Sequence, residues 1–424
     1  MIIVCEPQCK GFSHEKVNSG FLYGLRLAFP EEKILVYADP SHILALNAIL
    51  LHDEIPVDNI EFVSIEFLLN DSFKAFFVYR KLFEKLLTNV ISEGEDRLFM
   101  LSFSPKILYV LKKLKQKQQF SKLKFTSILH GDFENVANDA PPSLLQSLPG
   151  SSTLDKIKQK TISEIFKRVL ELAFNKLAGL KNFPVKWFNA FFETKKMLQL
   201  FPSSDFRYIA LSPHALMNAA KYLDLEIFRM YAVVLPTVFA KPLPKPENSF
   251  VKFAVFGYGN ALMLKQVAQR LSQKGINKPY EIRIIGMDNS GLESFPNITC
   301  PSPGKQLTRS EMEKFAVDID MFLILYDQTR YRLTCSGSIL ESLSYMKPVL
   351  HFENDCINYF NREENPIGIC CSSIDEYADK MKDIIENYSA YSAKFDLFRE
   401  NISQLRDKVS IKNWAGTIHD SFTW

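Results

Sequence analysis

The alternation of short apolar runs with helix-length segments constrains the fold of this 424-residue chain more than any other feature. In the first half, Ser72–Ile91 and Pro105–Gln116 have the apolar spacing of helices that bury one face. Runs rich in β-branched and aromatic residues lie around them: Ile2–Cys5, Ile34–Ala38, Ile60–Val63, Leu98–Ser102 and Phe125–Leu129. This alternation predicts an α/β domain, with a parallel sheet covered by helices on both faces.

The alternation stops between about residues 140 and 205, which contain no strand pattern and are predicted to form a helical insertion. Residues 155–200 hold ten Lys or Arg against four Asp or Glu, interleaved with seven aromatic residues: Phe166, Phe174, Phe183, Trp187, Phe188, Phe191 and Phe192. A basic and aromatic surface suits peripheral contact with an anionic membrane. The alternative is a helical subdomain that packs its aromatic residues inward. The sheet pattern resumes at Tyr208–Leu211.

Prolines at positions 236, 242, 244 and 246 mark a boundary between two domains. Because proline lacks an amide donor and has a fixed φ angle, this stretch is predicted to be a linker. We assign residues 1–240 to an N-terminal domain, 241–250 to the linker and 251–424 to a C-terminal domain, whose tail is a candidate to pack back on the first domain. The second half repeats the alternation, with strands predicted at Val251–Phe256, Glu281–Ile285, Met321–Leu325 and Val349–His351, and helices from Ala261 and near Ser310–Val317, Ser338 and Ile374–Ile385. Two Rossmann-like domains of this kind face each other across a cleft.

The composition excludes several classes of protein. An apolar fraction of 47% and a charged fraction of 23% are those of a globular chain, and a net charge of +3 is too small to indicate a nucleic-acid partner. The seven cysteines lack metal-ligand spacing and include the adjacent Cys370 and Cys371, which favours reduced thiols in the cytoplasm over a secreted disulfide framework. The sequence has no signal-peptide pattern and no run of about 18 apolar residues that would span a membrane.

A glycine-containing turn follows the first predicted strand of the second half. Gly257, Tyr258, Gly259 and Asn260 lie between this strand and the helix from Ala261. Glycines at such a turn let the backbone approach a ligand, and the N-terminus of the following helix favours phosphate. A tight turn with a purely structural role is the alternative, since the third glycine of a dinucleotide-binding fingerprint is absent.

A second candidate loop joins the predicted strands Met321–Leu325 and Val349–His351. Ser336, Gly337 and Ser338 occur where this loop becomes a helix, so that amides and hydroxyls can converge on a phosphate. Glu341 follows one helical turn later, where a carboxylate can accept hydrogen bonds from ribose hydroxyls. The alternative is a capping box, in which Ser338 caps the helix and Glu341 closes the cap.

In this order, these segments resemble the C-terminal donor domain of GT-B fold glycosyltransferases, in particular the retaining group related to sucrose and mannosyl transferases. The resemblance covers roughly residues 251–386. It includes the strand and turn Val255-Phe-Gly-Tyr-Gly-Asn and the strand end Ile284-Ile-Gly-Met-Asp. It continues with the helix and strand Leu307-Thr-Arg-Ser-Glu-Met-Glu-Lys-Phe and Val317-Asp-Ile-Asp-Met-Phe-Leu-Ile-Leu, and with the segment Leu340-Glu-Ser-Leu-Ser-Tyr-Met-Lys-Pro-Val. It implies that a nucleotide diphosphate sugar binds here as co-substrate, with Glu341 on the ribose and Lys265 near the diphosphate.

The chain departs from that family at two positions. Leu333 stands where the family often has a second glutamate, and Asn260 replaces the arginine that binds the donor diphosphate. Arg330 and Arg332 are candidates to neutralise the diphosphate instead, with a solvated surface role as the alternative.

The N-terminal half contributes two further candidate segments. Gly11, His14 and Asn18 lie in a loop after the first predicted strand, where the resemblance implies an acceptor-side loop. His130 and Asp132, at the end of the strand Phe125–Leu129, are similar to the element that many such enzymes place beside the transferred sugar. There His130 would bond the sugar and Asp132 would orient or deprotonate an acceptor hydroxyl. The alternatives are a surface turn with an incidental histidine, and an aspartate that caps a helix beside a satisfied histidine.

The sequence therefore predicts a hexosyltransferase that uses a nucleotide diphosphate sugar and a saccharide or lipid-linked acceptor, in bacterial-type surface glycan synthesis. It is expected to be cytoplasmic, with possible peripheral contact at the inner face of the membrane. No metal is required, because Asp318 and Asp320 precede a strand instead of following one and basic residues are available. The alternatives are a nucleotide-sugar 2-epimerase and an inactive relative that only binds the sugar nucleotide.

Overall fold

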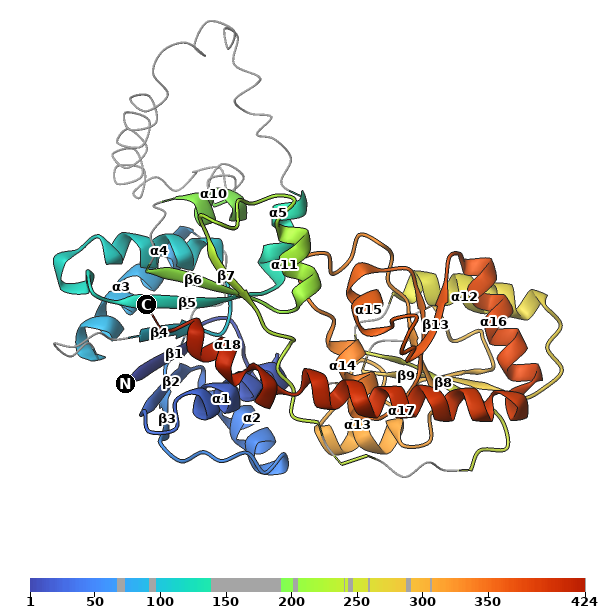
Figure 1. Ribbon diagram of the computed structural model, residues 1–424. Coiled ribbons are helices and arrows are strands. Elements are labelled where there is room, and N and C mark those ends of the chain that lie inside the picture. Colours follow the sequence, from blue (N-terminus) through green and yellow to red (C-terminus); the bar gives the residue numbers. More distant parts are fainter. Residues whose placement is uncertain are drawn as a thin grey trace, which may run out of the picture.

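A computed structural model describes residues 1–66, 73–90, 97–138, 192–200, 205–239, 241–242, 247–257, 260–286, 291–305 and 307–423. Figure 1 shows two lobes side by side, which correspond to the two halves of the chain. Most of the predicted insertion, including the basic aromatic stretch before Phe192, lies outside the described residues. Its described end contains the short helix α10 (Thr194–Gln199).

The described part of the N-terminal domain contains a parallel sheet of seven strands in the order β3-β2-β1-β4-β5-β6-β7. Its strands are β1 (Ile2–Glu6), β2 (Ile34–Ala38), β3 (Ile60–Ser64), β4 (Arg97–Met100), β5 (Lys124–Leu129), β6 (Phe206–Ala210) and β7 (Arg229–Ala232). Its longer helices are α1 (Glu15–Ala28), α2 (Pro40–His52), α3 (Phe73–Val90), α4 (Pro105–Lys115) and α11 (Pro213–Ala219), and the turn η2 (Gly131–Glu134) leads into α5 (Asn135–Asn138). In the centre, Val4 lies opposite Val36 on one side and Phe99 on the other.

The described part of the C-terminal domain contains a parallel sheet of six strands in the order β10-β9-β8-β11-β12-β13. Its strands are β8 (Lys252–Phe256), β9 (Glu281–Ile285), β10 (Ile298–Thr299), β11 (Met321–Ile324), β12 (Val349–Phe352) and β13 (Gly368–Cys371). The helices are α12 (Ala261–Gln273), α13 (Arg309–Ala316), α14 (Gly337–Ser344), α15 (Asp355–Phe360), α16 (Ile374–Glu386), α17 (Ser392–Val409) and α18 (Ala415–Asp420). The turn η4 (Ile411–Trp414) joins α17 to α18.

Both sheets have the same doubly wound order, and this order places the candidate sites. β1 lies between β2 and β4, and β8 lies between β9 and β11. The strand order reverses at these points, where the loops after neighbouring strands diverge and leave room for a ligand at the carboxyl edge. The loop that contains Gly11 follows β1, and the turn that begins at Gly257 follows β8. The predicted fold class is therefore confirmed.

Three strands that the sequence analysis does not predict, β7, β10 and β13, each lie at the edge of a sheet. They span four, two and four residues, and only β13 has fully buried positions. Edge strands need no long apolar run, because one side of the strand has no neighbour, so the hydrophobic pattern gives no signal for them. The tail beyond residue 386 contains the 18-residue helix α17.

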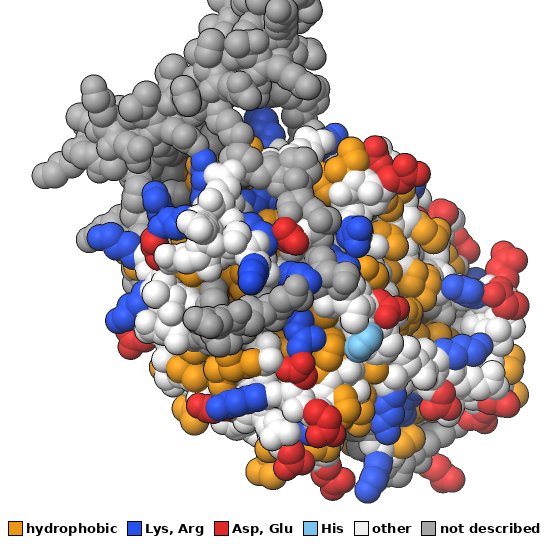
Figure 2. Space-filling view, turned by 60° about the vertical axis from the view of Figure 1, so that its left-hand side comes forward, with side chains coloured by type: hydrophobic (Ala, Val, Ile, Leu, Met, Phe, Trp, Pro, Cys, Tyr) orange, Lys and Arg blue, Asp and Glu red, His pale blue; other side chains and the backbone are white. Residues whose placement is uncertain are grey.

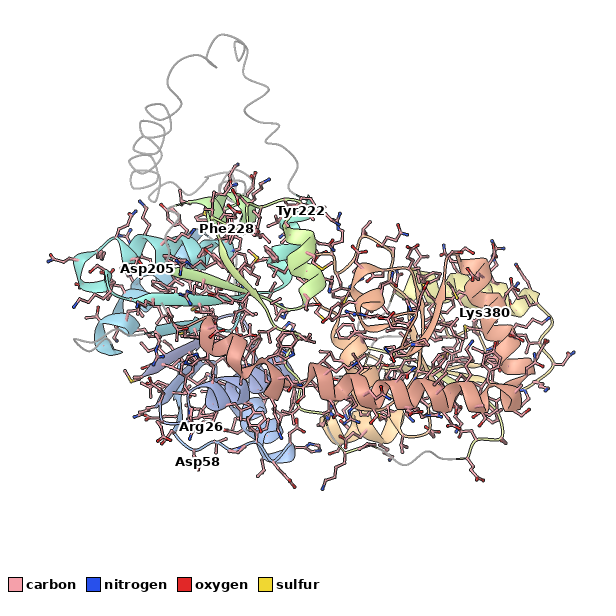
Figure 3. All side chains as sticks on the ribbon, in the orientation of Figure 1. Arg26, Asp58, Asp205, Tyr222, Phe228 and Lys380 are labelled. Carbon is pink, nitrogen blue, oxygen red and sulfur yellow. The ribbon has the colours of Figure 1, made fainter. Side chains whose placement is uncertain are left out.

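A single hydrophobic cluster extends through both domains. It contains Val4 and Ile128 of the first sheet, Phe256 and Ile324 of the second, and the connecting segment Val233–Leu235. Separate clusters cover the outer face of each sheet. Figure 3 shows Phe228 and Tyr222 near the end of the N-terminal domain that is distant from the C-terminal helix α18, where Phe228 is buried in the outer cluster and Tyr222 packs against it.

The chain returns to the N-terminal domain after α17, and α18 packs against α1 (Figure 1). Phe422, just beyond α18, stacks on Phe99 with ring centroids 5.2 Å apart. Two glycines of α1 make close approach possible: a Cβ atom on Gly24 would lie 2.6 Å from Ile418, and one on Gly20 would lie 2.6 Å from the carbonyl oxygen of Pro236. The face of α1 therefore receives both the segment before the linker and the C-terminal tail.

Figure 2 shows basic and acidic side chains interspersed over the visible face of the described residues. None of the helices in the described ranges is both long enough and apolar enough to cross a membrane.

The close approach at Gly20 predicts a cost for any side chain there. Gly20→Ala should lower the free energy of unfolding by about 1–3 kcal/mol, because the backbone of Pro236 must move. Gly416→Ala in α18 is the matched control: a Cβ atom there meets nothing within 4 Å, so the better helix propensity of alanine should leave stability unchanged or raise it by up to about 1 kcal/mol. Urea or thermal unfolding measures both variants, and equal effects would contradict the packing described.

Candidate functional site

The two candidate loops of the C-terminal domain meet at the point where its strand order reverses. The Ser338 hydroxyl donates to the carbonyl oxygen of Phe256 at 2.8 Å, one residue before the turn at Gly257. The hydroxyl of Tyr326, at the end of β11, donates to Ser338 at 2.9 Å and accepts from Ser336 at 3.2 Å. Gly257 has a φ of +69°, a conformation that favours glycine and lets the chain turn sharply after β8. These bonds hold the turn and the serine loop together as one surface.

The N-terminus of α14 opens onto this surface. Its N-cap residue, Ser336, makes no side-chain capping bond, and a Cβ atom on Gly337 would meet nothing within 4 Å. The capping-box alternative is wrong, because Ser338 lies inside the helix and the Glu341 carboxylate pairs with cations instead. The helix end therefore presents backbone amides where an anion is favoured.

Glu341 is held between one cation from each domain. Its carboxylate lies 2.8 Å from the ammonium of Lys16 in α1 and 3.2 Å from the guanidinium of Arg309 in α13. Burial raises the pKa of Glu341, but attraction to Lys16 and Arg309 outweighs burial and lowers it. Burial in turn lowers the pKa of Lys16 to about 8, against the opposing attraction of Glu341. No local pattern singles out either cation, because they meet Glu341 only in the tertiary structure.

Glu134, which the sequence analysis also missed, holds the loop that leads to Ser336. Its carboxylate accepts from the backbone amides of Arg332 at 2.6 Å and Leu333 at 2.9 Å, and from the Thr334 hydroxyl at 3.1 Å. Leu333 is fully buried in the outer cluster of the N-terminal domain. The leucine that replaces the expected glutamate is thus an apolar contact between the domains.

Two more N-terminal side chains bind the same loop. His214 donates from Nε2 to the carbonyl oxygen of Tyr331 at 2.9 Å, because a carbonyl oxygen can only accept, and its Nδ1 lies 2.6 Å from the Ser212 hydroxyl. Asn218 donates to the carbonyl oxygen of Arg332 at 3.0 Å and to the Asp355 carboxylate at 2.9 Å. The loop therefore has both its donors and its acceptors paired across the interface.

The predicted diphosphate-binding residues differ in their surroundings. Lys265 is exposed on α12 and has no ion pair or hydrogen bond within the described parts of the chain. The guanidinium of Arg330 is exposed and lies 5.7 Å from the ring centroid of Tyr326, while the half-buried Arg332 contributes backbone bonds to the interface. The Asn260 side chain caps α12 by accepting from the backbone amide of Met263, the third residue of the helix. Tyr258 and Gly259 lie outside the described residues.

The loop after β1 is fixed by a buried polar network. Glu6 is fully buried and accepts from Asn18 at 3.1 Å and from the Ser102 hydroxyl at 2.7 Å. Asn18 also donates to Nε2 of His42, whose Nδ1 donates to the carbonyl oxygen of Gly11 at 2.8 Å. Asn18 is 1% exposed, so it supports the loop from beneath and does not line its surface.

His14 and His130 form an edge-to-face pair at the carboxyl edge of the first sheet, with ring centroids 4.3 Å apart. Neither imidazole has a hydrogen-bond partner among the described residues, which disfavours the alternative of a satisfied histidine at His130. Burial, and then the neighbouring His14, lower the pKa of His130 to about 3. Asp132 follows in η2, where its backbone carbonyl accepts from Thr194 at 3.0 Å.

The aspartates before β11 serve the fold. Asp318 pairs with Lys252 at 2.5 Å and with Arg283 at 2.5 Å. Asp320 accepts from the Tyr388 hydroxyl at 2.6 Å. Both lie at the amino end of the strand, on the opposite edge from the loops described above. Among the described residues, no group of three or more His, Cys, Asp or Glu side chains has the arrangement of a metal site.

The strand order, the two facing domains and the returning C-terminal helix define the GT-B fold, and solved structures with this fold match the whole chain. The apo form of the lipopolysaccharide outer core galactosyltransferase WaaB has a TM-score of 0.57 at 13% identity, covering 99% of both chains. HepE of Anabaena in complex with UDP-glucose has a TM-score of 0.57 at 11% identity, again over 99% of both chains.

A mutant of S. aureus TarM in complex with fondaparinux, α-GlcNAc-glycerol and UDP has a TM-score of 0.58 at 9% identity over 100% of both chains. No protein-family model and no curated protein matches the sequence. At these identities the likeness establishes the fold, whereas the chemistry has to be argued from the residues.

The lowered pKa of His130 predicts how stability depends on pH. Between about pH 6.5 and 3 the unfolded chain binds a proton at this position that the folded chain does not. The contribution of the neutral imidazole to stability is therefore lost as the pH falls through this window. His130→Gln should flatten the pH dependence of the free energy of unfolding between about pH 6.5 and 5. An imidazolium NMR signal from His130 at pH 6 would contradict this.

Proposed function

We propose that this protein is a glycosyltransferase that transfers a hexosyl unit from a nucleotide diphosphate sugar to an acceptor hydroxyl. The observation that carries the proposal is the convergence of the Gly257 turn and the Ser336–Ser338 loop where the strand order of the second sheet reverses. Across the interface, Lys16, two residues after His14, pairs with Glu341 of α14 at 2.8 Å. HepE, with UDP-glucose bound, and TarM, with UDP and a saccharide bound, support this class of ligand.

The donor would lie on the C-terminal domain. The diphosphate would meet the amides at the start of α14, where Gly337 leaves the approach open. Lys265 and Arg330 are exposed cations suited to the charge that develops on the leaving diphosphate, so the charge needs no other neutralising group. Glu341 would accept from the ribose hydroxyls with the lone pairs that Lys16 and Arg309 leave available.

The acceptor, a saccharide or a lipid-linked saccharide, would lie on the N-terminal domain. The neutral His130 can donate to or accept from a sugar hydroxyl, since its imidazole has no hydrogen-bond partner among the described residues. Asp132 would orient or deprotonate the acceptor hydroxyl. In the transfer, the acceptor oxygen bonds to the anomeric carbon as the bond from that carbon to the diphosphate oxygen breaks. Burial at the interface would exclude water that hydrolyses the donor.

We further propose that transfer retains the anomeric configuration and serves surface glycan synthesis at the cytoplasmic face of a membrane. The basic aromatic stretch of residues 155–200 supports the membrane contact by its composition.

A panel of UDP-, GDP- and ADP-sugars tests the proposed reaction. At least one donor should raise the melting temperature by several degrees and should be hydrolysed slowly without acceptor or consumed faster with acceptor saccharides. Interconversion of two donors without acceptor would instead indicate an epimerase. Binding without turnover would indicate an inactive relative, and neither binding nor turnover with any donor would refute the proposal.

A double-mutant cycle tests the role of Glu341. Glu341→Ala should weaken the affinity for the nucleoside diphosphate about tenfold, because a charge-assisted hydrogen bond to ribose is lost. Lys16→Met is the control, since it breaks the pair between the domains and leaves the carboxylate in place. If Glu341 binds ribose, Glu341→Ala must lower the affinity in the Lys16→Met background as well. Calorimetric affinities that are unchanged in that background would show that Glu341 only joins the domains.

A further inference from the structure

The turn η2 connects His130 to Glu134, and the proposed reaction requires both to be correctly placed at the interface. It begins directly after His130 and ends at Glu134. The carboxylate of Glu134 binds two consecutive amides and the next hydroxyl of the facing loop, at 2.6, 2.9 and 3.1 Å. Ser336, the N-cap of α14, lies two residues beyond Thr334.

These contacts are specific to a carboxylate in the closed arrangement of the domains. A carboxylate has only acceptors, so both of its oxygens can face N–H and O–H donors at once. Bonds to an ionised acceptor are about twice as strong as neutral ones. All three donors belong to the other domain, 198 to 200 residues further along the chain. Separation of the domains therefore breaks all three bonds together.

The loop around Tyr331 and Arg332 has a backbone conformation that contacts from other segments stabilise. Tyr331 has a φ of +58°, in the left-handed region that a residue with a side chain seldom adopts. Its carbonyl oxygen and that of Arg332 are bound by His214 and Asn218 of the N-terminal domain. Asn354 of the same domain binds the carbonyl oxygen of Arg330, so the N-terminal domain holds the part of the loop from Tyr331 to Thr334, which leads directly to Ser336.

We propose that Glu134 is a positioning residue that fixes the donor loop, Arg332–Ser338, relative to His130 only when the domains are closed. This rests on the proposed function for its effect on the reaction, although the contact itself does not. Since η2 begins directly after His130 and ends at Glu134, the same short turn would place the sugar-binding imidazole and the diphosphate-binding helix end at a fixed separation. Correct placement of these groups lowers the energy of the transition state more than it strengthens binding of the substrates.

Glu134→Gln tests the proposal with little change in shape. The amide has one acceptor oxygen, and in either orientation its NH₂ group would face a backbone N–H, that of Arg332 or that of Leu333. Glu193→Gln is the matched control, because Glu193 pairs at 2.8 Å with Lys196 of its own domain. Hydrogen exchange of the amides in residues 330–338, UDP affinity by calorimetry, and the kcat and KM of the donor found active in the panel are the readouts.

In Glu134→Gln, exchange at the amides of Arg332 and Leu333 should rise at least about tenfold, while the central strands of both domains keep the wild-type rates. The kcat should fall about tenfold or more, and the donor KM should change less than about threefold. Glu193→Gln should match wild type in every readout. Glu134→Asp, which keeps the charge on a shorter side chain, should recover part of kcat.

Unchanged exchange at Arg332 and Leu333 would overturn the contact, whether or not the protein transfers sugars. Raised exchange with wild-type kcat and KM would overturn the positioning role. If no donor is turned over by the wild type, the proposed function fails separately. Hydrogen exchange at Arg332 and Leu333 then decides the question, because a loop fixed by Glu134 should exchange faster in Glu134→Gln than in Glu193→Gln.

Discussion

The hydrophobic cluster that runs through both domains sets the relation between the two sheets, and the rest of the interface depends on it. Val233–Leu235 continues this cluster out of the first sheet, and Ile411 and Ile418 return to it after α17. The chain thus crosses between the domains twice, and buried apolar residues of this cluster lie beside each crossing. Burial of this kind is non-directional, so it brings the two carboxyl edges together without specifying any individual contact.

Polar contacts supply the specificity that the cluster lacks. One segment of the C-terminal domain, Arg332–Ser344, is held at its start by Glu134 and near its end by Lys16, which pairs with Glu341 and donates to Ser344 at 3.1 Å. Both N-terminal side chains lie at the interface, where partial exclusion of water strengthens charged contacts. Phe256 and Tyr326 hold the serine loop within its own domain, while the N-terminal domain holds the segments before and after it.

Much of the fold follows from local patterns. The central strands were predicted within about two residues, since buried parallel strands are continuous apolar runs bounded by turns. The start of α12 at Ala261 follows from the Asn260 cap. The edge strand β10 was not predicted, because two residues with no buried side chain have no periodic apolar pattern. Ser338 and Glu341 have the spacing of a capping box, but the Glu341 carboxylate pairs with Lys16 and Arg309 instead.

The sequence by itself determined two Rossmann-like domains, the turn at Gly257 and the helix start near Ser338, because glycine conformations, caps and apolar periods act over a few residues. Only the tertiary structure decided the partners of these segments: Lys16 for Glu341, Glu134 for the loop before Ser336, and the N-terminal cluster for Leu333. The physical reason is that such contacts join residues far apart in the chain, and a side chain's partner depends on how two apolar faces pack, which no local pattern records.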